Sequence, residues 1–126
     1  MTRVADTSVL YALFSEDDAW HARAKEAFAE VDPVRVPSEI LVETIDLLAY
    51  RFGHASGARA LEALLALPHV TVAEQVEAAA VQAIHAAGRG TLSLADAYVV
   101  QTCLMLGAEV LSYDEDIRDE LFRRRP

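Results

Sequence analysis

The sequence predicts an α/β fold in which helices cover both faces of a parallel sheet. Its 126 residues suit one compact domain, so we expect the whole chain, residues 1–126, to form a single unit. Four short apolar segments alternate with longer segments whose apolar residues recur at helical spacing. Because parallel strands are joined by long crossovers, this alternation predicts three layers, α/β/α, around a sheet of four strands.

Local signals justify each element in turn. The expected strands are too short to be helices and end near turn residues; they are 3–6, 34–37, 70–72 and 109–112. The expected helices each carry an apolar stripe; they are 8–14, 18–31, 38–52, 56–67, 74–87, 93–106 and 115–124. The turns between these elements are short, so no linker or internal repeat is predicted.

Charge and composition exclude several classes of protein. The chain has 11 basic and 20 acidic residues, a net charge of −9, so it lacks the positive stripe of proteins that coat nucleic acid with cations. No apolar run reaches the roughly 20 residues of a membrane span, and the start shows no apolar signal core. Cys103 is the one cysteine, so we expect a buried small hydrophobe and no internal disulfide. These features favour a cytoplasmic protein.

Four acidic residues are expected at one edge of the sheet. In open α/β sheets, ligands bind beyond the carboxyl ends of the strands. Asp6 and Asp114 follow the first and fourth strands, and Glu43 lies about one and a half turns into the helix after the second strand. Asp96 lies near the start of a helix that must run antiparallel to the fourth strand, because only residues 107–108 join the two. The four carboxylates are therefore expected to face one crevice.

Carboxylates gathered in this way require a positive charge. Two of them about 5 Å apart repel by roughly 3 kcal/mol at an effective dielectric near 20. The one lysine, Lys25, falls mid-helix on a surface face, so a divalent metal is the better counter-charge. Oxygen ligands with hydroxyl groups nearby, at Thr7, Ser8 and Ser112, suit Mg²⁺ or Mn²⁺, whereas zinc usually has Cys or His ligands.

Helix capping is an alternative use of the same acids. Asp6 and Asp114 stand where N-cap residues would, and Asp96 completes a capping box that begins at Ser93. Capping explains why an acid is tolerated at a helix start. It does not explain why four acids address one edge, or why Glu43 lies beyond a first turn, so the pattern favours a functional site.

Four segments carry these acids along the chain. They are Val4-Ala5-Asp6-Thr7-Ser8-Val9-Leu10, Val36-Pro37-Ser38-Glu39-Ile40-Leu41-Val42-Glu43, Leu92-Ser93-Leu94-Ala95-Asp96-Ala97 and Ser112-Tyr113-Asp114-Glu115-Asp116. In this order and spacing, and in a chain of this length, they resemble the PIN-domain nucleases, in particular the VapC-type toxins of prokaryotic toxin–antitoxin pairs.

The resemblance implies a sheet ordered 3-2-1-4-5 and an endoribonuclease that hydrolyses RNA phosphodiester bonds with Mg²⁺ or Mn²⁺. Its catalytic and metal-binding residues would be Asp6, Glu43, Asp96 and Asp114, with Asp116, Ser112 and Thr7 assisting. It further implies a homodimer and a VapB-type antitoxin whose tail blocks the acidic pocket. Many relatives continue into a fifth strand where this sequence ends, so a sheet of four strands is expected and a fifth is left open.

An acidic nuclease must still hold RNA locally. The candidate contacts are Arg51, Arg89, Arg118 and the terminal run Arg123 to Arg125. Solvated or helix-terminal cations are the alternative interpretation of Arg51 and Arg89, and a frayed tail is the alternative for the terminal run.

Other acidic α/β proteins fit less well. A response-regulator receiver needs a lysine at a late strand end, and an aspartate phosphatase needs a second aspartate where Ser8 stands; the chain offers neither. A PIN-like module that keeps a metal pocket but binds a partner without catalysis stays open. Mg²⁺-dependent cleavage of RNA would separate the two.

Overall fold

A parallel sheet of four strands organises the part of the chain that the structure, a computed structural model, describes, namely residues 1–88 and 92–125. The strands are β1 (Arg3–Ala5), β2 (Val34–Val36), β3 (Val70–Val72) and β4 (Glu109–Leu111). They lie in the order β3-β2-β1-β4, and all three pairs are parallel. This arrangement confirms the predicted α/β class and the first four positions of the expected sheet order.

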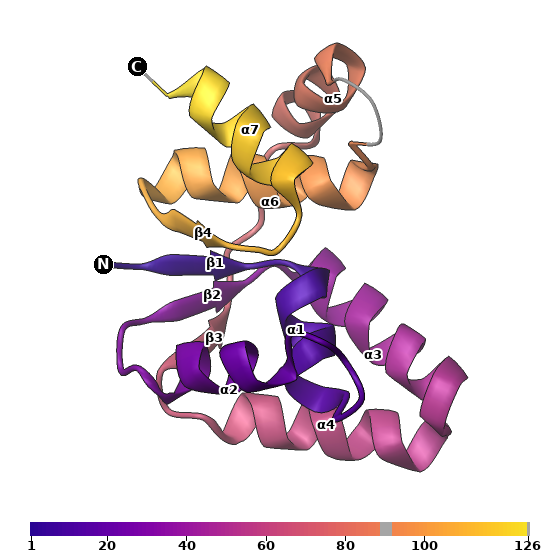
Figure 1. Ribbon diagram of the computed structural model, residues 1–126. Helices are drawn as coiled ribbons and strands as arrows, with labels where there is room; N and C mark the ends of the chain where they lie inside the picture. The colour runs from indigo at the N-terminus through magenta and orange to yellow at the C-terminus, as the bar shows by residue number, and fades with distance from the viewer. Residues whose placement is uncertain (89–91, 126) are drawn as a thin grey trace.

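Helices flank the sheet in two groups (Figure 1). One group contains α1 (Thr7–Phe14), α2 (His21–Ala29), α3 (Ser38–Phe52) and α4 (His54–Ala66), and the other contains α5 (Ala78–Ala87), α6 (Leu94–Leu106) and α7 (Glu115–Arg124). Within the described residues α7 is the last element, so they include no fifth strand. No described helix combines the length and the apolar character needed to cross a membrane.

The core forms where the central strand meets the helices on both sides. Val4 and Ala5 of β1 are completely buried, because a parallel strand between two neighbours is covered on both faces. Leu10 of α1 and Val99 and Val100 of α6 are also completely buried and belong to the same apolar cluster. The apolar stripes of the helices therefore bury against the sheet, as their spacing predicts.

Two predicted helices begin three and four residues later than expected. The helix predicted from residue 18 begins at His21, because the Asp18 carboxylate accepts the Trp20 backbone N–H at 2.8 Å and holds a turn before it. The helix predicted from residue 74 begins at Ala78; just before the predicted start, Ala73 donates its N–H to the carbonyl of Val36 in β2. The hydrogen bond to the Asp18 side chain overrides the apolar spacing at the first of these places.

The direction in which successive strands are added to the sheet reverses beside β1. The chain passes from β1 to β2 and β3 on one side and then returns across the sheet to β4 on the other side. The carboxyl ends of β1 and β4 therefore flank the point at which the direction of strand order switches. In open α/β sheets, such a switch point is where the connections diverge and leave a crevice for a ligand.

Candidate functional site

Asp6 and Asp114 leave the sheet on either side of the switch point. Asp6 follows β1 directly, and its backbone N–H donates to the carbonyl of Leu111, the last residue of β4, at 3.2 Å. Asp114 follows β4 by three residues and forms the N-cap of α7. The parallel pairing of β1 with β4 therefore brings together two acids that are far apart in the sequence.

Two serines fix the buried carboxylate of Asp6. Ser8 donates its hydroxyl to Asp6 Oδ1 at 2.7 Å, and Ser112 donates to Asp6 Oδ2 at 2.7 Å. The Asp114 backbone N–H donates to Ser112 Oγ at 2.9 Å, so Ser112 bridges the two acids. The Val9 N–H also donates to Asp6 Oδ1 at 3.3 Å, which makes Asp6 the N-cap of α1. Asp6 is only 3% exposed, so its orientation is fixed by these bonds.

Asp96 and Glu43 are carried by two further helices, and together with Asp6 and Asp114 they make up what we call the acidic edge. Asp96 lies in the first turn of α6, where its Oδ2 accepts the Ser93 N–H at 2.9 Å and its own N–H donates to Ser93 Oγ at 3.1 Å. Glu43 lies in α3 and is exposed, and Thr7 at the start of α1 donates its hydroxyl to Glu43 Oε1 at 2.5 Å. The helix starts that carry these side chains meet at the carboxyl ends of the strands (Figure 1).

Burial and mutual repulsion make negative charge unfavourable here. Burial raises the pKa of Asp6 above its ordinary value, and the Asp114 carboxylate adds to the rise, while hydrogen bonds from Ser112, Ser8 and Val9 oppose it. Burial also raises the pKa of Asp96; the hydrogen bonds with Ser93 oppose this, and the charges of Asp114 and Glu43 add to it. Asp114 therefore interacts electrostatically with both Asp6 and Asp96, and Glu43 with Asp96, which a set of unrelated caps would not require.

The donor set fits a hard divalent cation. The acidic edge offers carboxylate and hydroxyl oxygens, and Cys103 does not contribute a ligand, because it is completely buried and burial raises the pKa of its thiol to about 12. In residues 1–88 and 92–125, no three Asp, Glu, His or Cys side chains stand close enough to share one ion in the present arrangement. The carboxylates surround one edge without already forming a closed cage.

A cavity of about 440 Å³ opens beside the acids. Asp114 and the hydroxyl residues Thr7 and Ser8 line it, and so do Trp20 and Tyr113. Neither aromatic residue was predicted from the sequence as part of the site. Tyr113 stands between Ser112 and Asp114 and could have been suspected for that reason, whereas no local signal connects Trp20 with the fourth strand.

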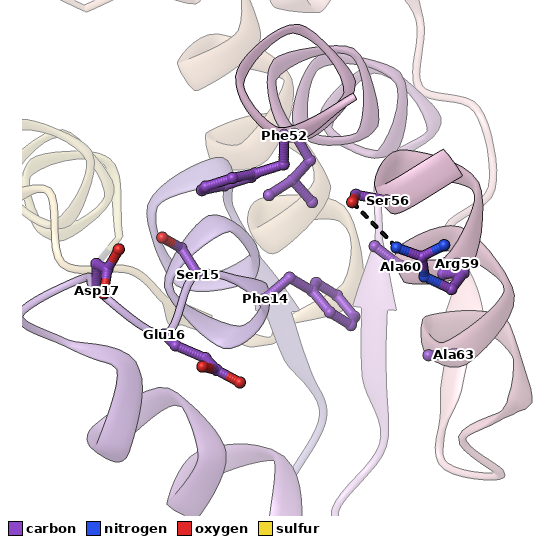
Figure 2. Close-up of a pocket in the computed structure, with 10 residues that line it drawn as sticks. Phe14, Ser15, Glu16, Asp17, Phe52, Ser56, Arg59, Ala60 and Ala63 are labelled. Atoms are coloured by element: carbon purple, nitrogen blue, oxygen red, sulfur yellow. Dashed lines mark hydrogen bonds between the residues drawn. The ribbon is translucent and has the colours of Figure 1, made fainter. Parts of the chain in front are cut away.

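A second cavity, of about 550 Å³, lies away from the acids (Figure 2). It is formed by the end of α1, the loop that follows and the hairpin of α3 and α4, with Phe14, Phe52 and Arg59 among its lining residues. None of the four acids is among the residues that line it. We therefore treat this cavity as separate from the acidic edge.

The arginines predicted to contact RNA lie in different places. Arg118 is nearest to the acids, since it donates to the Ser112 carbonyl at 3.3 Å. Arg51 lies at the far end of α3, with its guanidinium over the Phe52 ring. Arg123 pairs with the buried Glu120 at 2.5 Å, and Arg125 donates to the carbonyl of Ala108, at the amino end of β4. Arg89 falls outside the described residues.

Comparisons with known proteins cover nearly the whole chain. The family model described as PIN domain matches residues 3–120. The crystal structure of VapC20 from Mycobacterium tuberculosis, described as a toxin that cleaves the sarcin–ricin loop, is similar, with a TM-score of 0.79 and 27% sequence identity. The similarity covers 93% of this chain and 93% of that chain. No curated protein matches the sequence significantly. These findings confirm the resemblance predicted from the acidic motifs, and this chain belongs to the PIN-domain family.

Proposed function

We propose that this protein is a metal-dependent endoribonuclease of the VapC toxin type, with Asp6, Glu43, Asp96 and Asp114 as its catalytic and metal-binding acids. The observation that carries the proposal is that these acids come from four separate segments and interact near the switch point of a PIN-domain sheet, Asp114 with Asp6 and Asp96, and Glu43 with Asp96. We place its action in the cytoplasm, where RNA is available.

Divalent metals are the general cofactors of PIN-domain nucleases. For this chain we propose Mg²⁺ or Mn²⁺, because its donors are oxygen atoms. When bound, such an ion lowers the pKa of a coordinated water and stabilises charge that develops on the phosphate. Asp6, Asp96 and Asp114 would hold it, and Glu43, the most exposed of the four acids, would hold an outer water or orient the attacking one.

Hydroxyl groups keep these carboxylates in position. Ser8 and the Val9 N–H both donate to Asp6 Oδ1, whereas Ser112 alone, among the described residues, donates to Oδ2, which leaves a lone pair on Oδ2 free to face a cation. Thr7 likewise donates its hydroxyl to Glu43 and holds that carboxylate in position. Asp116 follows Asp114 in the first turn of α7, so we propose it as an accessory acid rather than a main ligand.

Phosphate contact near the acids is best supplied by Arg118. Its side chain is about half exposed, at 47%, and is anchored beside Ser112. Arg123 is engaged by buried Glu120, and its neighbour Arg125 is held at the amino end of β4, which favours a structural role for the terminal run. Arg51 stays a candidate for a more distant stretch of RNA.

The α3–α4 hairpin is the surface that we propose for protein partners, a VapB-type antitoxin and a second copy of the chain. Leu47, Tyr50 and Phe52 of α3 and Leu65 of α4 are large apolar side chains exposed by 42%, 91%, 43% and 49%. A set of this kind is typical of interaction surfaces. A monomeric mass in light scattering, for the chain alone and with its antitoxin, would contradict this part of the proposal.

The decisive experiment is RNA cleavage by the purified protein with and without Mg²⁺ or Mn²⁺, followed by mapping of the new RNA ends. The substrates should include sarcin–ricin loop RNA, because the similar VapC20 structure is described as that of a toxin that cleaves it. We expect cleavage that needs metal and is lost in Asp6→Asn and Asp96→Asn. Glu109→Gln, an exposed acid at the amino end of β4, is the matched control and should cleave normally. If RNA stays intact under every condition, the protein is a PIN-like binding module without catalysis.

A further inference from the structure

An exposed aromatic stack stands beside the acidic edge. The rings of Trp20 and Tyr113 lie 4.8 Å apart between centroids with an interplanar angle of 19°. The Arg23 guanidinium carbon is 5.0 Å from the Trp20 centroid and 5.9 Å from the Tyr113 centroid. The loop before α2, the first turn of α2 and the segment between β4 and α7 therefore build one flat, cationic unit.

One face of Trp20 is not covered by its partners in the stack. The Arg23 guanidinium is at similar distances from the two ring centroids, so it does not lie directly across Trp20 from Tyr113. Trp20 is 42% exposed and takes no part in the buried core. Its backbone N–H is held by Asp18 and its ring by Tyr113, so this face is presented in a fixed orientation.

The stack is hydrogen-bonded to the acidic site. The Tyr113 backbone N–H donates to Ser8 Oγ at 3.0 Å, and Ser8 donates in turn to Asp6 Oδ1 at 2.7 Å. Trp20, Tyr113 and Asp114 line the same cavity of about 440 Å³, which lies within the size range of small-ligand sites. A group that rests on the stack is therefore held at a fixed offset from the carboxylates.

We propose that Trp20 stacks on one nucleobase of single-stranded RNA next to the bond that is cut, with Arg23 facing the adjoining phosphate. This inference rests on the proposed ribonuclease function and identifies the form of RNA that the site accepts. Unstacked bases bind aromatic side chains through their flat faces, and arginine adds a cationic contact. Arg23 forms no ion pair within 4 Å in the described part of the chain, so its charge is available at an otherwise acidic edge.

Paired bases of a duplex do not expose their faces, so the stack would select loops or single strands. It would tolerate different bases, because every base has a flat face. Selection by shape of this kind does not need the extended basic surface that the sequence lacks.

The first test uses the fluorescence of Trp20, the only tryptophan in the chain. In Asp96→Asn protein with Mg²⁺, a short oligouridylate should quench this fluorescence to saturation. An oligomer of abasic ribose phosphates, which keeps the backbone but has no bases, should leave it nearly unchanged. Absent quenching, or equal quenching by the two oligomers, would overturn the proposal.

The second test separates binding from chemistry. Since stacking contributes binding before and during the reaction, Trp20→Ala should raise KM by about 5- to 150-fold with kcat largely kept. Trp20→Phe should restore most of the affinity, and Arg23→Gln should weaken binding less, with an effect that fades at high salt. Phe122→Ala, another exposed aromatic on α7, is the matched control and should cleave like wild type.

The outcomes distinguish the two proposals. Wild-type cleavage together with an unchanged KM in Trp20→Ala would overturn the stacking site alone. Quenching of Asp96→Asn protein by oligouridylate, together with no RNA cleavage by the wild-type protein, would support the stacking site and reject the ribonuclease function. A folded Trp20→Phe that binds as poorly as Trp20→Ala would also contradict stacking, because phenylalanine keeps an aromatic face.

Discussion

At the scale of single residues, each aspartate of the acidic edge caps a helix in addition to its proposed role as a metal ligand. Asp6, Asp96 and Asp114 each accept backbone N–H bonds at a helix start, so the capping interpretation is correct as far as it goes. Backbone N–H groups and the positive end of each helix favour the ionised form, whereas burial and repulsion oppose it. Capping thus helps to hold in place charges that would otherwise separate.

Ser112 is the residue on which the positions of two acids depend. It donates to Asp6 Oδ2 and accepts the Asp114 N–H. We expect Ser112→Ala to lower kcat/KM for RNA by about 10- to 100-fold, the usual effect of removing a group that orients metal ligands. Ser56→Ala, on the distant α4, is the matched control and should have no effect. A Ser112→Ala enzyme with wild-type activity would contradict the bridging role.

The raised pKa values of Asp6 and Asp96 predict how the stability of the metal-free protein depends on pH. A carboxyl group whose pKa is higher in the folded state keeps its proton better when folded, so its contribution to stability is lost as pH rises through the folded pKa. Urea unfolding in EDTA should therefore show that Asp96→Asn loses less stability than wild type from acid to neutral pH. Equal slopes would contradict this, and Glu109→Gln is expected to follow wild type.

At the scale of elements, the connection between α6 and β4 decides where Asp96 lies. Gly107 ends α6 in the left-handed conformation, with φ of 60° and ψ of 34°, and its N–H donates to the carbonyl of Cys103. This tight turn lets α6 reverse directly into β4, so its start returns to the carboxyl edge of the sheet. The acid in its first turn therefore meets the acid that follows β4.

Gly107→Ala tests the cost of this turn. Nothing lies within 4 Å of the position where its Cβ would be, so the penalty comes from the backbone conformation alone. We expect a loss of about 1–2 kcal/mol of unfolding free energy in urea denaturation, the cost of placing a side chain in this region. Gly107→Asn should lose less, because asparagine tolerates the conformation better. An unchanged stability in both variants would mean that the turn relaxes.

At the scale of the whole molecule, strand order concentrates negative charge at one point of an already acidic protein. The strand order reverses between β1 and β4, and Asp114 interacts there with Asp6 and Asp96, and Asp96 with Glu43. The net charge of −9 adds to the repulsion that a bound cation would relieve. Metal binding and folding stability should therefore be linked.

Mn²⁺ should raise the thermal unfolding temperature of the wild-type protein. A ligand at about 100 times its Kd stabilises the native state by about 2.7 kcal/mol if it binds only that state. Asp96→Asn should show a much smaller shift, while Glu109→Gln should respond like wild type. Equal shifts in all three proteins would mean that Mn²⁺ binds elsewhere.

The sequence by itself determined the α/β class, the positions of the strands and most helices, and the order of the acidic motifs. These features depend on local properties, namely apolar spacing, short turns and the residues next to each strand end. Only the tertiary structure decided which distant groups meet, because hydrogen bonds and packing between remote segments leave no local pattern. The pairing of β1 with β4 joins Ser112 to Asp6, the loop before α2 places Trp20 on Tyr113, and buried Glu120 forms an ion pair with Arg123.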